Sequence, residues 1–199
     1  MRPARRHDWT IVEFLQWEEQ QALRYEFDGF QPVAMTGGTA AHADIQANLA
    51  ASLRTRLRGK PCKFYGSDLK IEVAGHVRYP DGFVVCSPVA GKSTIVTDPV
   101  VIFEILSPST SSTDRILKNR EYAATPSVQR YVILEQDRIA AMVFERVADD
   151  WVGHVLLEDA VLVMLEIGIE VPLAEFYEGL VFEDIEGGEG IEPDIASNL

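Results

Sequence analysis

The segment that decides the fold reads VVIFEIL and spans residues 100–106. All its positions but one are apolar, which is typical of a strand that is buried on both faces of a sheet. The exception is Glu104, whose carboxylate is costly to bury unless a cation or hydrogen bonds compensate its charge. An edge strand with this carboxylate in solvent is the alternative interpretation.

A second acid precedes another apolar run. Asp81 follows Pro80 and comes just before FVVC at residues 83–86. Two strands that bring Asp81 and Glu104 to one edge of a sheet would form an oxygen-lined pocket suited to Mg²⁺. Because Pro-Asp-Gly is also a common turn signal, a simple turn residue is the alternative for Asp81.

A lysine follows the second acid on an expected helix. This helix stops at Ala124, and Asp114 can cap it. Asp114, Lys118 and Tyr122 are spaced by four and share one helix face. Lys118 can fold back over the pocket, although a solvated helix position is its ordinary role. Two acids and a lysine around a divalent ion suggest phosphodiester hydrolysis.

The N-terminal third carries three local signals. A capping box at Thr10 predicts a helix that runs to about Leu23, and Asp28-Gly29 predicts a hairpin over residues 25–35. Thr39 predicts a helix N-terminus whose end comes by Gly59. The hairpin and the second helix each bring one polar residue of interest: Glu26, interpreted as a surface acid or a third carboxylate of the metal site, and His42, interpreted as a core or cap residue.

Further apolar runs predict strands over residues 63–73, 82–86, 100–106, 129–134, 139–146 and 151–157. Residues 161–180 fit a strand and a short terminal helix. The pattern predicts an α/β (α+β) fold, with a mixed sheet flanked by helices. We expect one domain over residues 1–182 and an acidic, flexible tail over 183–199.

Charge is distributed unevenly along the chain, whose formal net charge is −13. Residues 1–134 carry 16 Lys and Arg against 14 Asp and Glu, whereas residues 135–199 carry 2 against 17. The candidate site lies in the slightly basic part. Within it, one basic cluster surrounds the end of the second helix, where the helix dipole also favours cations: Arg54, Arg56, Arg58 and Lys60. These four residues are candidates for contact with nucleic-acid phosphates.

Cysteine content and hydropathy suggest a cytoplasmic protein that does not enter a membrane. No apolar run approaches the roughly 20 residues of a membrane helix, and no signal core follows the basic N-terminus. Cys62 and Cys86 form no CxxC pair, so both are predicted to be reduced and structural. The sequence does not determine the oligomeric state and leaves a homodimer open.

Several of these motifs together resemble the Uma-two family of bacterial candidate restriction endonucleases. The resemblance rests on Pro80-Asp81, on the stretch from Glu104 to Thr110, and on Asp114-x-x-x-Lys118-x-x-x-Tyr122. Tyr25-Glu26 with Asp28-Gly29, and His42, also match. The family is similar to the PD-(D/E)XK nucleases, which implies a restriction-endonuclease-like fold with a central mixed sheet.

The resemblance also implies roles for individual residues. Asp81 and Glu104, with the Ile105 carbonyl, would hold Mg²⁺ (or Mn²⁺), and Lys118 would orient water or stabilise charge. Glu26 could assist a second ion. The superfamily usually places its lysine two residues after the second acid, which is Leu106 here, so the lysine has moved to the helix.

Three functions follow from these patterns. The first is a metal-dependent endonuclease that acts on phosphodiesters, with DNA as the expected substrate. The second is a protein-interaction module that keeps the fold without catalysis, which the acidic C-terminal part favours. The third is a nucleic-acid-binding module without cleavage. An ion held by Asp81 and Glu104 would distinguish the first from the others.

Overall fold

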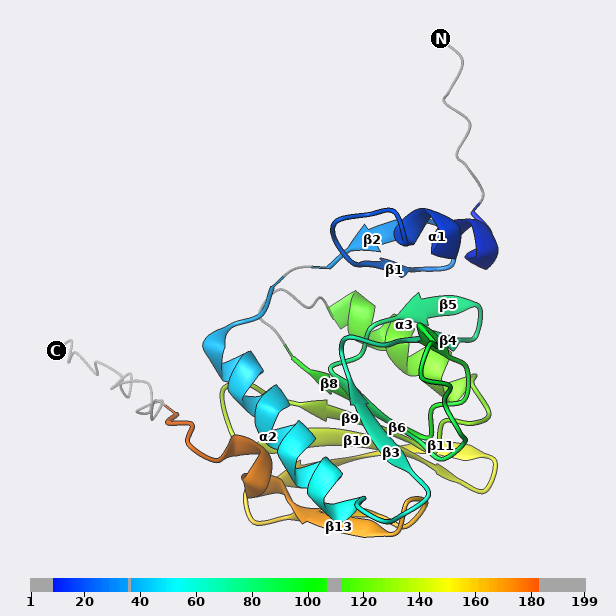
Figure 1. Cartoon of the computed structure of the whole chain (residues 1–199). Coiled ribbons are helices and arrows are strands. Elements are labelled where there is room, and N and C mark those ends of the chain that lie inside the picture. The colour runs from blue at the N-terminus through cyan, green and yellow to red at the C-terminus, as the bar shows by residue number, and fades with distance from the viewer. Residues whose placement is uncertain (1–8, 36, 107–111, 183–199) are drawn as a thin grey trace, which may run out of the picture.

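A mixed sheet forms the centre of the molecule. The computed structural model describes residues 9–35, 37–106 and 112–182. The central strands are β3 (Lys63–Gly66), β6 (Gly82–Val85), β8 (Val101–Ile105), β9 (Arg130–Leu134), β10 (Ala140–Val147) and β11 (Asp150–Leu157). Their order is β11-β10-β9-β8-β6-β3 (Figure 1). Only β8 and β9 pair parallel, and the other neighbours in this sheet are antiparallel.

Two apolar cores cover the two faces of this sheet. One core packs against α2 (Ala40–Arg56), the β12 (Val161–Met164) and β13 (Ile169–Pro172) hairpin, and the 3-10 helix η1 (Leu173–Tyr177). The other core includes Tyr122 of α3 (Ser112–Ala123).

Strand β8 contributes to both cores because successive side chains alternate between the two faces of a strand. Val101, Phe103 and Ile105 belong to the core under α2, and Ile102 belongs to the core under α3. This explains the apolar run at residues 100–106. The same alternation places Glu104 on the α3 side of the sheet.

A second sheet lies beside the first. Its strands are β1 (Tyr25–Phe27), β2 (Pro32–Ala34), β4 (Lys70–Val73), β5 (His76–Arg78) and β7 (Ile95–Val96), in the order β2-β1-β5-β4-β7. Helix α1 (Ile11–Glu18) packs on it through Phe14, which joins Phe27 and Val77 in a third apolar cluster.

The local signals in the N-terminal third are confirmed. Thr10 and Glu13 form both hydrogen bonds of the capping box, and Thr39 caps α2 by accepting from the His42 amide. In the hairpin, Asp28 accepts from the backbone amides of Phe30 and Gln31. Helix α1, however, ends at Glu18 rather than near Leu23.

Three other boundaries differ from the prediction. Residues 63–73 are two strands in different sheets, separated by a turn over Gly66–Leu69. Helix α3 begins at Ser112, two residues before the predicted start at Asp114. Residues 161–180 form two strands and a 3-10 helix. The predicted tail at 183–199 lies outside the described residues. Within the described residues, no helix is long and apolar enough to cross a membrane.

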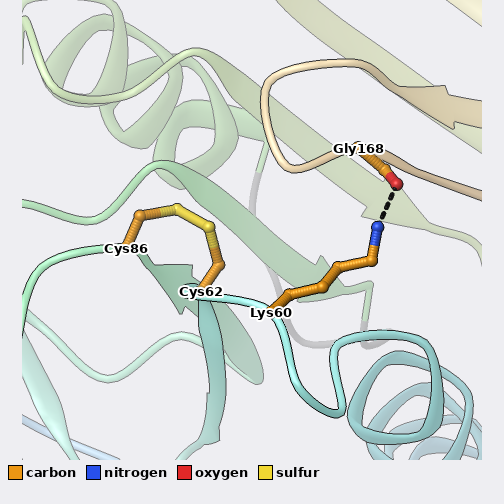
Figure 2. The surroundings of a disulfide bond; sticks show 4 residues. All are labelled: Lys60, Cys62, Cys86 and Gly168. Carbon is orange, nitrogen blue, oxygen red and sulfur yellow. Dashed lines mark hydrogen bonds between the residues drawn. A yellow bond between two sulfur atoms is a disulfide. The ribbon is translucent and has the colours of Figure 1, made fainter.

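The two cysteines form a disulfide, so the prediction that both are reduced is wrong. Strands β3 and β6 pair antiparallel with Lys63 opposite Val85, and Cys62 and Cys86 occupy the next opposed positions. Their sulfur atoms are bonded (Figure 2). The sequence offered no motif for this pairing, because the two residues are brought together only by the strand register.

Candidate active site

Asp81 and Glu104 lie opposite each other where β6 and β8 meet. These strands pair antiparallel with Gly82 opposite Phe103, so the next opposed positions are those of Asp81 and Glu104. The two side chains are 14% and 13% exposed, respectively. Glu104 does not lie on an edge strand, since β8 has neighbours on both sides. The register of two apolar strands thus brings both predicted acids together.

Gly82 has a packing role at the start of β6 and does not complete a tight turn after Asp81. Gly82 is the first residue of β6, and it is not among the glycines with positive φ. A Cβ atom at this position would lie 2.6 Å from the Phe64 ring and 3.2 Å from Leu49 Cδ2. The glycine is therefore needed for close packing against α2 and β3. Asp81 itself lies in a bend directly before β6, and its contacts with His42 and the Ile105 amide hold it in position.

Helix α3 brings a cation and a hydroxyl to Glu104. Lys118 Nζ lies 3.1 Å from Glu104 Oε1, and the Tyr122 hydroxyl donates to the same oxygen at 3.0 Å. Lys118 and Tyr122 are one helical turn apart, as their spacing predicted. The Lys118 side chain is 12% exposed, so the interpretation as a solvated helix position is wrong.

The surroundings of Glu104 favour its neutral form. The pKa of Glu104 is raised to about 7, mainly by burial and in part by the charges of Asp81 and Glu26, while Lys118 acts to lower it. One lysine and one hydroxyl therefore do not fully compensate the ionised carboxylate. A further cation at this position would stabilise it.

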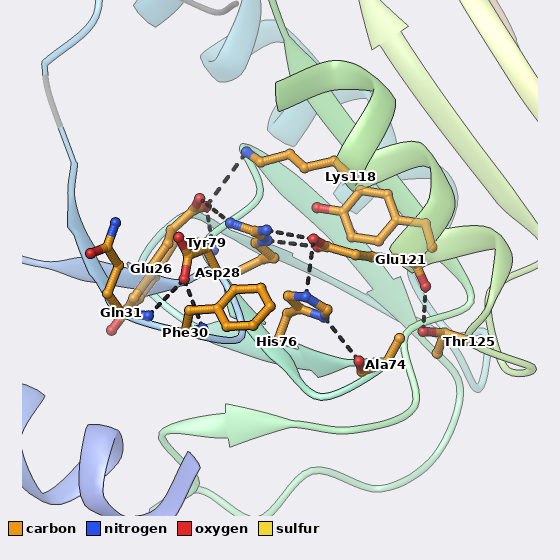
Figure 3. A network of polar contacts seen from close by, with 12 residues as sticks. Glu26, Asp28, Phe30, Gln31, Ala74, His76, Tyr79, Lys118, Glu121 and Thr125 are labelled. Atoms are coloured by element: carbon orange, nitrogen blue, oxygen red, sulfur yellow. Dashed lines mark hydrogen bonds and ion pairs between the residues drawn. The ribbon is translucent and has the colours of Figure 1, made fainter. Parts of the chain in front are cut away.

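Glu26 joins the same cluster from β1. Its Oε1 accepts from the Tyr79 amide at 3.1 Å and lies 3.5 Å from Lys118 Nζ. Its Oε2 accepts from Arg78 at 3.1 Å. Figure 3 shows Glu26 and Lys118 pointing toward each other. The side chain is 12% exposed, so the interpretation as a surface acid is wrong. A role with a second ion stays a prediction, since protein donors already engage both oxygens.

A buried ion-pair network behind Glu26 was missed in the sequence. Arg78, on β5, donates two hydrogen bonds to Glu121 of α3, at 2.8 and 2.6 Å. His76 Nε2 lies 3.4 Å from the same carboxylate (Figure 3). Arg78 thus connects Glu26 with the helix that carries Lys118. Charged side chains in a short strand gave no sequence signal of burial.

Asp81 is held from two sides. The Ile105 amide donates to its Oδ2 at 2.7 Å. From α2, His42 Nε2 lies 3.1 Å from its Oδ1, and Gln46 donates to the Asp81 carbonyl at 3.1 Å. The hydrogen bond with Asp81 raises the pKa of His42. His42 is therefore a site residue rather than a core or cap residue, and its spacing of four from Gln46 on the helix was the available signal.

A cavity of about 830 Å³ opens over this cluster. Its lining includes Glu26, His42, Gln46, Asp81, Glu104, Ile105 and Lys118. Among the described residues, no group of three or more His, Cys, Asp or Glu side chains could hold a metal ion. A structural Zn²⁺ site, which needs four such ligands, does not fit. Mg²⁺ does fit, because it keeps several waters and uses one or two carboxylates.

The predicted phosphate-binding cluster lies at the other end of α2. Arg56 is engaged within the protein, since it reaches Glu175 at 2.6 Å and donates to the Glu170 carbonyl. Lys60 donates to the Gly168 carbonyl at 2.6 Å (Figure 2). Arg54 and Arg58 are exposed. None of the four lines the cavity above Asp81 and Glu104.

A family model described as "Putative restriction endonuclease", named Uma2, matches residues 11–174. The chain belongs to this family. The match includes every residue of the cluster, from Glu26 on β1 to Tyr122 on α3. It also includes His42 and Gln46, the two residues of α2 that contact Asp81. The Uma2 description names a class of hydrolase, and the resemblance given by the sequence motifs is confirmed.

Two relatives of this Uma2 chain come from Synechocystis sp. (strain ATCC 27184 / PCC 6803 / Kazusa). The uncharacterized protein slr1290 is 34% identical over 174 residues, which cover 85% of this chain and 92% of that protein. The uncharacterized protein sll1609 is 27% identical over 145 residues, or 70% of this chain and 82% of that protein.

The fold is similar to a solved one. The crystal structure of "a putative nuclease belonging to DUF820" from Anabaena variabilis ATCC 29413 superposes with a TM-score of 0.70 at 18% identity. The superposition covers 85% of this chain and 97% of that chain. This likeness confirms the predicted class, a mixed sheet flanked by helices in a nuclease fold.

Proposed function

We propose that this chain is a Mg²⁺-dependent endonuclease that hydrolyses phosphodiester bonds in DNA. The observation that carries the proposal is the convergence of Asp81, Glu104 and Lys118 on one cavity. The family description and the fold of the solved neighbour support it. The raised pKa of Glu104, caused first by burial, also supports a site suited to an additional cation.

Asp81, Glu104 and the Ile105 carbonyl would hold the ion, with water as the remaining ligands. Mg²⁺ is the expected ion and Mn²⁺ the substitute, because carboxylate, carbonyl and water ligands suit both. When bound, the ion supplies Lewis acidity at the scissile phosphate.

The side chains of this chain do the rest. In the hydrolysis, water adds to phosphorus and the bond to the leaving oxygen breaks, which yields a phosphomonoester and an alcohol. The Lys118 ammonium stabilises the negative charge that develops on the phosphoryl oxygens. Glu26 and Glu104 keep Lys118 in place, and His42 with the Ile105 amide fixes the orientation of Asp81.

A plasmid-nicking assay tests the proposal. Supercoiled DNA is incubated with the protein and Mg²⁺, Mn²⁺ or EDTA. We expect nicked and linear DNA with either metal and none with EDTA, and we expect Asp81→Asn to abolish cleavage. The matched control is Asp149→Asn, since Asp149 is exposed in the turn between β10 and β11 and does not line the cavity. Equal cleavage by wild type and Asp81→Asn would refute the site.

A module without catalysis is the second candidate, and the uneven charge favours it. Residues 135–199 carry 17 acids against 2 basic residues, and such charge opposes tight binding of DNA. Isothermal titration calorimetry with Mg²⁺ separates the two functions. A module that has lost the metal site would bind Mg²⁺ no better than its Asp81→Asn and Glu104→Gln variants.

A further inference from the structure

A second cavity lies between the C-terminal half of α2 and β3. Its volume is about 710 Å³. Of its twelve lining residues, four are Lys or Arg and none is Asp or Glu: Arg54, Arg58, Lys60 and Lys63. Lys60 donates to the Gly168 carbonyl, whereas Arg54, Arg58 and Lys63 are exposed side chains beside the cavity.

This basic lining contrasts with the charge of the whole chain. A protein with a formal net charge of −13 repels polyanions at long range. At short range, a groove lined by one sign of charge attracts the opposite sign. The basic lining therefore makes this groove a favourable place for contact with a phosphate backbone. Arg56, which the sequence placed in the basic cluster, does not line this cavity and pairs with Glu175 instead. Lys63, which the sequence did not single out, does line it.

The second cavity adjoins the first. Gly66 lines the basic cavity, and the next residue, Ser67, lines the cavity over Asp81 and Glu104. Gln46 of α2 donates to Ser67 Oγ at 3.2 Å and also to the Asp81 carbonyl. Both cavities therefore have residues of α2 in their lining, and they meet where β3 ends and its following turn begins.

The helix sets the distance between the two ends of this path. His42 lines the first cavity and Arg54 lines the second. At a rise of 1.5 Å per residue, the two positions are about 18 Å apart along α2. One strand of a DNA duplex advances about 3.4 Å per phosphate, so this distance corresponds to roughly five phosphates.

We infer that the groove between α2 and β3 binds the backbone of substrate DNA, with Arg54, Arg58 and Lys63 contacting phosphates about five nucleotides from the bond at Asp81 and Glu104. This inference rests on the proposed function, because it names how the same substrate reaches the site. The phosphate contacts thus come from residues that line the groove, and not from every basic residue at the end of α2.

The test measures DNA binding without cleavage. A fluorescein-labelled 20-base-pair duplex of mixed sequence is titrated with protein in EDTA by fluorescence anisotropy, at a series of KCl concentrations. The same series uses a single strand of equal length. The groove variant is Arg58→Gln/Lys63→Gln. The matched control, Arg138→Gln/Lys92→Gln, removes one arginine and one lysine from exposed positions elsewhere. Circular dichroism checks that both variants are folded.

For the groove variant, we expect the slope of log K against log[KCl] to become less steep by up to about 1.8, which is about 0.9 for each lost phosphate contact. The control should keep the wild-type slope. An unchanged slope in the groove variant, equal losses in both variants, or no binding by wild type would overturn the inference. A larger loss for the single strand than for the duplex would overturn the duplex geometry.

This outcome is independent of the plasmid assay. Binding that depends on Arg58 and Lys63 without any metal-dependent cleavage would keep the groove and refute the nuclease. Metal-dependent cleavage by wild type together with an unaltered salt slope in the groove variant would support the nuclease function and refute DNA binding by the groove.

Discussion

The ammonium of Lys118 lies 3.1 Å from Oε1 of Glu104, although the two residues belong to different elements and different layers. Lys118 is on α3 and Glu104 is on β8, and both Lys118 and Tyr122 of the helix reach Glu104 Oε1. The same nitrogen is 3.5 Å from Glu26 Oε1. One cation thus lies between two carboxylates at the wall of the cavity, where charge on a bound phosphate would develop.

This position predicts the effect of Lys118 on the rate. Lys118→Met should reduce the cleavage rate by roughly 10²–10³-fold, as the loss of one preorganised electrostatic donor does. Metal and DNA binding should change little, because the interaction strengthens as the reaction proceeds. Lys118→Arg should not restore the full rate, since a planar guanidinium does not replace a compact ammonium.

Single-turnover cleavage of a labelled duplex measures this rate. The control is Lys92→Met, which removes an exposed loop lysine. Wild-type rates in Lys118→Met would remove the lysine from the mechanism and leave a two-carboxylate site.

The raised pKa of Glu104 predicts a pH dependence of stability in the metal-free protein. Because burial raises this pKa from its ordinary value near 4.5 to about 7, the folded state holds a proton that the unfolded chain releases. The stabilising contribution is therefore complete below pH 4.5 and is lost as the pH rises through about 7. Glu104→Gln, which can still accept from Tyr122 and Lys118, should lack this loss.

Urea unfolding in EDTA at pH 5 and pH 8 measures the difference. We expect wild type to lose more stability than Glu104→Gln between these two values, and we expect Mg²⁺ to reduce the loss in wild type. Parallel changes in the two proteins would show that Glu104 ionises normally, and would remove one support for the metal site.

Local signals predicted much of the fold. The Thr10 capping box, the Asp28-Gly29 turn and the Thr39 cap of α2 each depend on residues close in sequence. The central strand β8 was predicted equally well, because a short apolar run such as residues 100–106 is typical of a strand that is buried on both faces. The missed boundary between β3 and β4 was also local, since Gly66-Ser67-Asp68 is a turn signal inside the predicted strand.

The rest could not be predicted, because it depends on contacts between distant segments. Arg78 and Glu121 are 43 residues apart and both are buried, yet each resembles an ordinary surface charge. Lys70 is similar: its side chain is 5% exposed and lies 2.6 Å from Glu18. The Cys62–Cys86 bond and the His42–Asp81 contact likewise require the register of strands and the placement of α2.

The buried position of Arg78 predicts a large loss of stability on its removal. Arg78→Met leaves Glu121 and Glu26 without their guanidinium partner, and breaking a buried pair from one side costs about 3–5 kcal/mol. The control is Arg56→Met, whose partner Glu175 has a side chain that is 39% exposed. That more exposed pair should contribute about 1 kcal/mol or less.

Chemical unfolding of both variants compares the two costs. Equal losses would mean that the network around Arg78 is as well solvated as the surface pair. A folded Arg78→Met protein should also cleave DNA more slowly than Arg56→Met, since Arg78 supports both Glu26 and the helix of Lys118.

The disulfide predicts a response to reductant that the sequence did not suggest. Cys62 and Cys86 are 24 residues apart, and closing such a loop restricts the unfolded chain, which typically stabilises a protein by about 2–4 kcal/mol. Cys62→Ala/Cys86→Ala should lower the free energy of unfolding by this amount. Tris(2-carboxyethyl)phosphine should lower the free energy of unfolding of wild type by a similar amount and leave that of the double variant unchanged. This comparison separates the effect of the disulfide bond from the effect of side-chain packing. Mass spectrometry of alkylated wild type provides the direct check: two alkylated cysteines in the unreduced protein would show that the bond does not form.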